Sequence, residues 1–321
     1  MKQVLVLFPI KDEAEKQLFL NTPGEYCYFF CEGESLDEWI ESSQIIIGQP
    51  TIEQIRKAKN LEWIQCTFAG VDYYLRDNKF PNQVLLTNST GAFGQSISEY
   101  LLTMLLSLYK KMDLYQEQQR KEIWGDLGAE TSLLGKTVLI VGAGDIGSSF
   151  AKLLSIFSTR TIGIRRKERE VPPYYESMYT LEELDYLLEV ADVVALCLPS
   201  TNETRGLMDA RRLRRMKKDA VLLNVGRGDA LVTEDLVTVL REGHLLGVGL
   251  DVIDPEPLPK GHPLWQMERV ILTPHIAGVS MNHLPETYQN VLTICTENLE
   301  RYAKGLPLKN IIDPKVGYRT I

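Results

Sequence analysis

Six short apolar runs that alternate with helical segments between residues 137 and 272 constrain the fold of this chain most strongly. Each run has the length of a strand and is apolar at nearly every position, which is typical of strands buried on both faces of a parallel sheet. Parallel strands need crossover connections, so the pattern predicts a doubly wound α/β domain. The predicted strands are Thr137–Val141, Arg160–Ile164, Val193–Leu198, Ala220–Val225, Gly247–Val252 and Val270–Leu272.

The N-terminal part of the chain contains shorter apolar runs, separated by turns and by helical segments such as Thr51–Lys59. These runs predict a second, smaller α/β unit of roughly a hundred residues. The runs are Val4–Phe8, Ile45–Ile47, Trp63–Cys66 and Val84–Leu86.

Two long helical segments connect the predicted units. One begins near Ser96 or Ser98, either of which can cap a helix, and runs toward Gln119. The other spans residues 284–303 and can carry the chain back to the smaller unit. We therefore expect a discontinuous smaller domain, residues 1–98 plus 288–321, and a continuous larger domain, residues 99–287.

The composition limits the possible functions. With 321 residues, 44% hydrophobic and 24% charged, the chain has ordinary globular composition and enough length for two domains. Its formal charge of −8 disfavours general binding to nucleic acid or to an anionic membrane, although arginines inside a cleft still attract a small anion. Five cysteines without C-x-x-C spacing argue against a disulfide framework or a metal site and favour a reducing cytoplasm. The apolar run at residues 4–10 continues into charged residues without a cleavage site, so we expect a strand there and not a signal peptide.

A glycine-rich motif follows the first strand of the larger domain. Gly142, Gly144 and Gly147 have the G-x-G-x-x-G spacing, with Asp145 and Ile146 between the last two. Such a triplet alone is a weak signal, because it also occurs in structural turns. Here a strand precedes it and an amphipathic helix follows, so the backbone can approach a pyrophosphate at a helix N-terminus. The larger domain is therefore predicted to be a Rossmann dinucleotide-binding domain.

The next strand ends in Arg165-Arg166-Lys167, where an acidic residue would bind the ribose of NAD. Two arginines at this place can hold the 2′-phosphate of NADP by charge-assisted hydrogen bonds. A solvated basic loop without a ligand is the alternative interpretation. We expect NADP to be preferred, with NAD possible.

His275 stands out among the four histidines. It follows the predicted strand Val270–Leu272, and Pro274 prevents simple continuation of that strand, so the imidazole is expected where doubly wound folds bind ligands. Imidazole is the usual proton donor near neutral pH. The other three histidines have no nearby signal for chemistry: His244, His262 and His283.

Two further side chains follow predicted strands. Arg227 lies between Gly226 and Gly228, which allow a sharp turn and leave room for a guanidinium that can hold a carboxylate. Glu256 lies in a proline-rich loop, and if it reaches His275 its charge favours the imidazolium and orients the ring. A surface ion pair for Arg227 and plain solvent exposure for Glu256 are the alternatives. An arginine, a carboxylate and an imidazole are the groups that reduction of a 2-oxo acid requires.

Together these residues resemble the D-isomer-specific 2-hydroxyacid dehydrogenase family over nearly the whole chain. The matching segments are Phe68–Asp72, Thr87–Gly91, Ile97–Tyr100, Leu134–Val138, Gly142–Gly147, Leu198–Thr201, Asn224–Gly228, Gly249–Val252, His262–Trp265 and Thr273–Gly278.

The resemblance implies a role for each matched residue. Arg227 would bind the substrate carboxylate or carbonyl oxygen, His275 would protonate the carbonyl oxygen, and Glu256 would partner His275. The smaller domain would be doubly wound, flavodoxin-like and substrate-binding, and its backbone amides around Ala69, Gly70 and Val71 would bind the carboxylate. Cofactor contacts are expected at Leu198, Pro199, Val225, Gly226 and Asp251, the last near the nicotinamide. The arginines Arg165 and Arg166 depart from the acidic residue that many members carry.

We therefore expect an oxidoreductase that reduces a small 2-oxo acid to the D-2-hydroxy acid by hydride transfer from NAD(P)H, with His275 as proton donor. The resemblance also implies a homodimer. Which acid is used stays open, because the three side chains read only the oxo-carboxylate. Corepressor-like, dinucleotide-sensing binding proteins share the resemblance and are the alternative; the charge of −8 and the lack of a Ser/Pro-rich interaction segment count against them.

Overall fold

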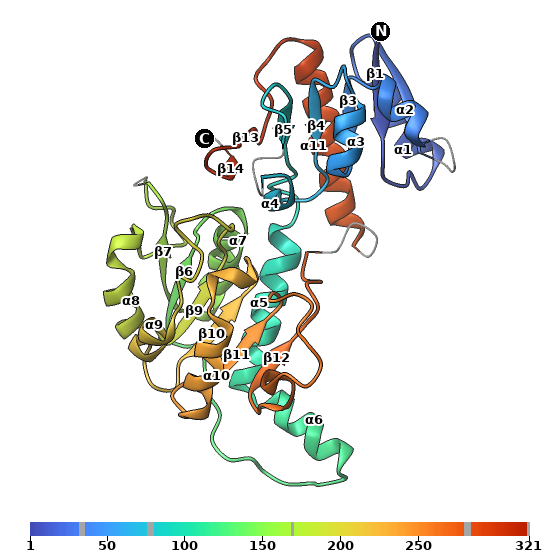
Figure 1. Cartoon of the computed structure of the whole chain (residues 1–321). Helices are drawn as coiled ribbons and strands as arrows, with labels where there is room; N and C mark the ends of the chain where they lie inside the picture. The colour runs from blue at the N-terminus through green and yellow to red at the C-terminus, as the bar shows by residue number, and fades with distance from the viewer. Residues whose placement is uncertain (32–35, 76–79, 168–169, 279–283, 320–321) are drawn as a thin grey trace. The chain divides into compact units, whose positions relative to one another are not determined.

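The computed structural model (Figure 1) describes residues 1–31, 36–75, 80–167, 170–278 and 284–319. Its residues group into two compact units. Unit 1 consists of Met1–Ala92 and Leu284–Ile321, and unit 2 consists of Phe93–His283. Unit 2 thus takes in the whole of helix α5 (Gly94–Tyr109), which a boundary after residue 98 would divide.

Unit 2 is built on a seven-stranded sheet in which every pair of neighbouring strands is parallel. All six predicted strands are present, and a seventh short edge strand, β8, was not predicted. The order across the sheet is β12 (Val270–Leu272), β11 (Gly247–Leu250), β10 (Val221–Asn224), β9 (Val193–Leu196), β6 (Thr137–Val141), β7 (Arg160–Ile164) and β8 (Ser177–Tyr179). The order in which the chain adds strands reverses between β6 and β9, because β7 and β8 follow on one side of β6 and β9 to β12 on the other. Ligands of doubly wound folds bind at this point.

Helices cover both faces of the seven-stranded sheet, as expected for buried parallel strands. In Figure 1, α5 and α7 lie to one side of it and α8, α9 and α10 to the other. Their bounds are α7 (Asp145–Leu154), α8 (Leu184–Val190), α9 (Ala210–Arg215) and α10 (Thr233–Arg241). The strands β6, β9 and β10 are fully buried between these layers.

The predicted helix from Ser96 or Ser98 to Gln119 is two helices. After α5 the chain turns at Lys111, whose φ is 54°, and α6 (Met112–Arg120) follows. Neither serine caps α5, because that helix begins at Gly94, and the Ser96 hydroxyl instead donates to the carbonyl oxygen of Ala277 at 2.9 Å. The expected cap was therefore wrong, and Ser96 ties α5 to the segment after β12.

Unit 1 contains a five-stranded parallel sheet with the order β2-β1-β3-β4-β5, which is the flavodoxin-like order. Strand β2, an aromatic run at the edge, was not predicted. The strands are β1 (Lys2–Val6), β2 (Tyr26–Phe30), β3 (Ile45–Ile47), β4 (Trp63–Gln65) and β5 (Leu85–Thr87).

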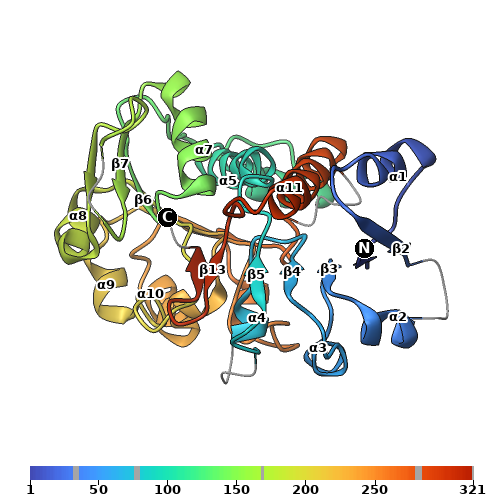
Figure 2. The same ribbon diagram turned by 90° about the horizontal axis from the view of Figure 1, so that it is seen from above.

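Figure 2 shows α1 and α11 on one side of the unit 1 sheet and α2 and α3 on the other. The helices are α1 (Glu13–Leu20), α2 (Leu36–Ser42), α3 (Ile52–Lys57), α4 (Asp72–Leu75) and α11 (Pro285–Ala303), and a hairpin of β13 (Ile312–Asp313) and β14 (Tyr318–Arg319) follows. Among the described residues, no helix has the length and apolar character needed to cross a membrane.

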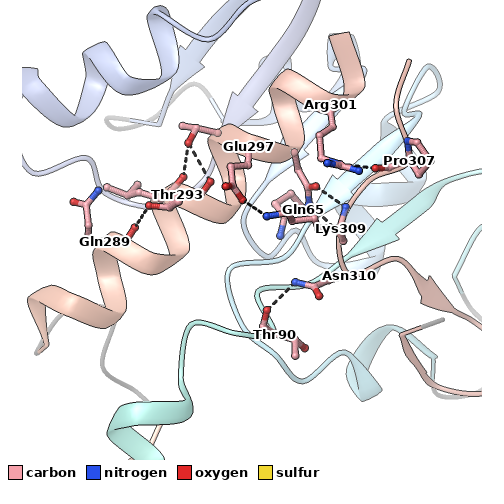
Figure 3. A network of polar contacts seen from close by, with 12 residues as sticks. Gln65, Thr90, Gln289, Thr293, Glu297, Arg301, Pro307, Lys309 and Asn310 are labelled. Atoms are coloured by element: carbon pink, nitrogen blue, oxygen red, sulfur yellow. Dashed lines mark hydrogen bonds and ion pairs between the residues drawn. The ribbon is translucent and has the colours of Figure 1, made fainter. Parts of the chain in front are cut away.

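A buried polar network holds the chain after α11 in unit 1 (Figure 3). The amide of Asn298, fully buried, donates to Oε1 of Gln65 at 2.7 Å and to the carbonyl of Lys309 at 3.1 Å, and it accepts from the Lys309 N–H at 2.7 Å. Asn310 donates to the carbonyl of Thr90 at 2.8 Å. The C-terminal segment is thereby fixed to β4 and to the end of β5.

Candidate active site

The glycine motif forms the turn between β6 and α7. Gly142 has a φ of +103°, and a Cβ there would lie 2.5 Å from the carbonyl oxygen of Cys197. A Cβ at Gly147 would lie 2.4 Å from the carbonyl oxygen of Gly142, so α7 packs against the turn at backbone distance. A Cβ at Gly144 would meet no atom within 4 Å. The first and third glycines are thus required by the fold, whereas the second leaves its backbone accessible.

The N-terminus of α7 begins at this accessible position. Gly144 is its N-cap, and no side chain of the described residues caps it. Asp145, Ile146 and Gly147 form the first turn, whose N–H groups have no helical acceptor. A helix N-terminus behind an open glycine fits the pyrophosphate of a dinucleotide.

Arg165 and Arg166 diverge after β7. The Arg165 guanidinium donates from Nε to the carbonyl oxygen of Ala143 at 2.5 Å and from Nη2 to Oγ of Ser148 at 3.4 Å. Arg165 therefore lies against the glycine turn, whereas Nε of Arg166 lies 3.7 Å from Oε2 of Glu203. Arg165 is thus held beside the turn that fits a dinucleotide.

The residues after β9 and β10 pack against each other. A Cβ on Gly226 would lie 2.5 Å from the carbonyl oxygen of Leu198, and the Val225 N–H donates to Leu196 at 3.1 Å. Leu198 and Val225 are nearly buried, whereas Pro199 is exposed. These residues line the sheet edge next to the glycine turn.

Arg227 is positioned by the end of β10. The fully buried Asn224 donates from Nδ2 to the carbonyl of Arg227 at 3.0 Å and accepts from the N–H of Gly226 at 3.1 Å. The glycines beside Arg227 have no positive φ, and a single 3-10 turn, Gly228–Ala230, begins directly after Arg227. They are required because a Cβ on Gly228 would lie 2.1 Å from the backbone of Ile253. Sequence reasoning missed Asn224, although a polar residue at the end of an apolar strand is a usable signal.

His275 and Glu256 form the pair that the sequence predicted. Nδ1 of His275 lies 3.0 Å from Oε1 of Glu256, and the two side chains are 45% and 41% exposed. His275 itself has a φ of 54°, in the left-handed region. Arg227, Glu256 and His275 follow the neighbouring parallel strands β10, β11 and β12. All three therefore lie on the side of the sheet where the carboxyl ends of its strands meet.

Asp251 is buried behind this edge. It is only 2% exposed, and its carboxylate accepts hydrogen bonds from the turn that carries His275. The sequence placed Asp251 near a cofactor but did not indicate this contact.

The other described histidines have local structural partners. Nε2 of His244 lies 2.8 Å from the carbonyl of Met216. His262 accepts at Nδ1 from the N–H of Leu264, and its Nε2 lies 3.2 Å from Glu234. His283 lies outside the described residues.

In unit 1, the loop after β4 carries the predicted carboxylate-binding amides. Asn88 donates to the carbonyl of Ala69 at 2.5 Å. In the described part of the chain, no group accepts a hydrogen bond from the N–H of Ala69, Gly70 or Val71. The substrate role of these amides stays a prediction.

Two further kinds of chemistry, at a bound metal and at a cysteine thiol, find no support among the described residues. No group of three or more potential metal-ligating side chains occurs among the described residues. Burial raises the pKa of Cys197, beside Gly142, to about 12, so this thiol is protonated at neutral pH and is a poor nucleophile.

Comparison with known proteins identifies the family. Residues 102–277 match the NAD-binding domain of the D-isomer specific 2-hydroxyacid dehydrogenases. The chain belongs to this family.

Relatives agree over nearly the full length. Glyoxylate/hydroxypyruvate reductase B of Enterobacter sp. is 31% identical, covering 98% of this chain and 99% of its own. A crystal structure of a family protein from Aeromonas salmonicida has a TM-score of 0.86 at 34% identity, covering 98% and 99% of the two chains. A D-isomer specific 2-hydroxyacid dehydrogenase from Xanthobacter autotrophicus, solved with NADPH and MES, has a TM-score of 0.81 at 27% identity and covers 99% of each.

Membership of this dehydrogenase family confirms two predictions. The chain has an α/β fold with two parallel sheets, and it is an NAD(P)-dependent oxidoreductase. The roles of single residues are not decided by these similarities, and neither is the choice between NAD and NADP.

Proposed function

We propose that this dehydrogenase reduces a small 2-oxo acid to the D-2-hydroxy acid with NADPH, and that His275 supplies the proton. The His275–Glu256 pair carries the proposal. Because Nδ1 of His275 is engaged by Glu256 at 3.0 Å, Nε2 is the nitrogen left to deliver a proton. Both side chains are about half exposed, so a small substrate can reach the imidazole.

Glu256 orients His275 in this proposal. Its carboxylate engages Nδ1 at 3.0 Å and so fixes the ring, which keeps Nε2 in one direction.

Arg227 would hold the oxo-carboxylate. Its guanidinium offers several donors, and Asn224 and the close approach of Gly228 to Ile253 fix its backbone. Binding by Arg227 would orient the carbonyl carbon of the substrate, while His275 acts at the carbonyl oxygen.

The cofactor, when bound, supplies the hydride. Gly142, Gly144 and the N-terminus of α7 would hold its pyrophosphate, and Arg165 would hold the 2′-phosphate of NADP, since it lies against the glycine turn. A relative solved with NADPH supports this preference. Arg166 would contribute less, because Glu203 lies 3.7 Å from it.

Glyoxylate and hydroxypyruvate are the first substrates to test, because both occur in the name of a full-length relative. The direct test is NADPH and NADH oxidation with a panel of 2-oxo acids. His275→Gln should cut turnover by about 10²–10⁴-fold and leave the NADPH Kd nearly unchanged. Normal turnover in the folded variant would remove His275 from its role, and no turnover of any acid by the wild type would favour a dinucleotide-sensing binding protein.

The cofactor preference has its own test. Arg165→Ala should lower kcat/KM with NADPH about tenfold to a hundredfold and leave NADH nearly unaffected, with Arg166→Ala as the matched control. A wild type that prefers NADH would return both arginines to the solvated-loop interpretation.

A homodimer through unit 2 completes the proposal. The arm of residues 112–132 carries a fully exposed Trp124, and the same unit has a surface cavity of about 370 Å³ lined by Leu133, Leu134 and Ile156 among others. An exposed tryptophan and an apolar cavity on one chain suit a symmetric dimer in which the tryptophan of each copy fills the cavity of the other. Light scattering after gel filtration should give a dimer for the wild type and a monomer for Trp124→Ser or Ile156→Asp. Unchanged dimers in both variants would exclude this surface.

A further inference from the structure

The loop after β4 is held by two residues that follow β5, all within unit 1. The Asn88 side chain donates from Nδ2 to the carbonyl oxygen of Ala69 at 2.5 Å. The N–H of Ser89 donates to the carbonyl oxygen of Phe68 at 3.1 Å, and the Ser89 hydroxyl donates to the carbonyl oxygen of Cys66 at 2.8 Å. Asn88 and Ser89 are 4% and 0% exposed. Two consecutive carbonyl groups of the loop, those of Phe68 and Ala69, therefore point toward the same buried pair.

These contacts also fix the direction of two N–H groups. A trans peptide unit is planar, so its N–H points opposite to its C=O. The carbonyl of Phe68 shares a trans peptide unit with the N–H of Ala69, and the carbonyl of Ala69 shares one with the N–H of Gly70. Both N–H groups therefore point away from Asn88 and Ser89. Successive N–H groups on one side of a turn can bind an anion.

The peptide between Ala69 and Gly70 depends most on this support. Gly70 is exposed and has no Cβ, so sterics alone restrict the rotation of this peptide little. The Asn88 carboxamide holds its carbonyl end. Loss of that hydrogen bond would leave the N–H of Gly70 without a fixed direction.

The carboxamide of Asn88 is itself held in one orientation. Its Oδ1 accepts from the N–H of Thr90 at 3.2 Å, which leaves the NH₂ group to face Ala69. Asn310, in the segment after α11, donates from Nδ2 to the carbonyl oxygens of Asn88 and Thr90 at 3.2 and 2.8 Å. The C-terminal segment thus positions Asn88, and Asn88 positions the loop.

We propose that Asn88 is a positioning residue for substrate capture: its carboxamide sets the direction in which the N–H of Gly70 meets the carboxylate of a 2-oxo acid. The inference deepens the proposed function and rests on it. A hydrogen bond to a charged group changes binding by about tenfold to a hundredfold, and a misdirected donor loses much of that factor. The loss should appear in the affinity for the substrate.

Asn88→Ser removes the contact to Ala69 and keeps support for the turn. A serine side chain is too short to reach the Ala69 carbonyl, but its hydroxyl can still accept from the N–H of Thr90, and it adds no charge. We expect the KM for glyoxylate or hydroxypyruvate to rise by about 5–30-fold, with kcat within about threefold of the wild type. The NADPH Kd, measured by fluorescence without substrate, should change by less than about threefold.

Asn298→Ser is the matched control. Asn298 is likewise a buried asparagine of unit 1 that donates to a backbone carbonyl, that of Lys309, but it does not contact the loop after β4. Its replacement should lower the stability of the protein and leave the KM within about twofold.

Asn310→Gly tests the support behind Asn88. Glycine suits the φ of 57° at this position and removes the donor to the Asn88 and Thr90 carbonyls. The KM should rise in the same direction by about 2–5-fold. If Asn88→Ser does not fold, as judged by circular dichroism, Asn310→Gly and the Asn298→Ser control decide the matter.

Titration of oxamate, an unreactive analogue of a 2-oxo acid, into the NADPH-saturated proteins needs no turnover. Its Kd should rise in Asn88→Ser by about the same factor as the KM. An unchanged oxamate Kd in Asn88→Ser, or an equal rise in Asn298→Ser, would overturn the inference, as would a wild type that binds no oxamate. Failure of the proposed function is a separate result, since it appears as a wild type that binds oxamate but turns over no 2-oxo acid.

Discussion

Replacing His275 by glycine should leave a more stable protein than replacing it by alanine. The reason is the φ of 54° at this position. A residue with a Cβ in the left-handed region costs about 1–2 kcal/mol more than glycine. The greater freedom of glycine in the unfolded chain offsets about 0.4–1 kcal/mol of that difference. The net expectation is that His275→Gly is more stable than His275→Ala by about 0.5–1 kcal/mol. Both variants lose the hydrogen bond to Glu256, so that loss cancels.

His262 offers a matched control, because its φ is −62° and its imidazole also has hydrogen-bonding partners. There the order should reverse, with His262→Gly less stable than His262→Ala by about 0.4–1 kcal/mol.

Urea and thermal unfolding of the four variants at neutral pH give the comparison. The difference at position 275 should move Tm by roughly 1–4 °C for a unit of this size. If His275→Gly is no more stable than His275→Ala while the His262 pair keeps its ordinary order, the left-handed turn at His275 is not present in solution.

Three further predictions follow from buried or charged contacts. Gly147→Ala would place a methyl group 2.4 Å from the carbonyl oxygen of Gly142, so NADPH affinity measured by fluorescence should fall by at least about tenfold, and unchanged affinity would contradict the close packing of α7. Hydrogen bonds from Arg211 and Arg212 in α9 lower the pKa of Asp185 to about 2. The resulting stabilisation is present at pH values above the ordinary carboxyl pKa and is lost as the pH falls through the lowered pKa. Asp185→Asn should therefore cost about 1–2 kcal/mol in urea unfolding at pH 7, after allowance for solvent screening, with a gap to wild type that closes as pH falls from about 4 toward 2; a gap independent of pH would refute the cause. Asn298→Leu leaves buried groups without partners and should cost about 3 kcal/mol and expose the C-terminal segment to proteolysis, whereas a cost below about 1 kcal/mol would mean that the network adds little.

The strands of unit 2 could be predicted because their signal is local. Runs such as Leu222-Leu223 are apolar on both faces, and only a buried parallel strand suits that pattern. Strand β8 (Ser177–Tyr179) has no such run, since it lies at the sheet edge and is only partly buried. The break between α5 and α6 was missed because it lies at Lys111, whose backbone is left-handed. Nothing in a sequence marks a lysine that adopts this conformation.

The candidate side chains were easier to find in the sequence than the groups that hold them in place. Arg227, Glu256 and His275 follow strands, and the edge where parallel strands end is known from the strand pattern alone. The pairing of His275 with Glu256 was predicted and is present at 3.0 Å. Asn224 and Asp251 are each polar residues at the end of an apolar strand, so their positions could be noticed in the sequence. Their partners could not, because these contacts to backbone groups of other loops exist only after folding.

The network around Asn298 has a consequence for synthesis on the ribosome. Unit 2 is one continuous stretch of chain and can become compact once residue 283 has emerged. Unit 1 cannot, because the amide of Gln65 in β4 meets Asn298, which in turn meets Lys309, more than two hundred residues later. The strands that are synthesised first are therefore completed last. Until then the nascent chain exposes an open, apolar sheet edge in unit 1, although unit 2 has already folded. Chaperones that bind exposed apolar strands should meet this protein at its beginning, and a ribosome that stops before Lys309 should release a chain with one folded unit.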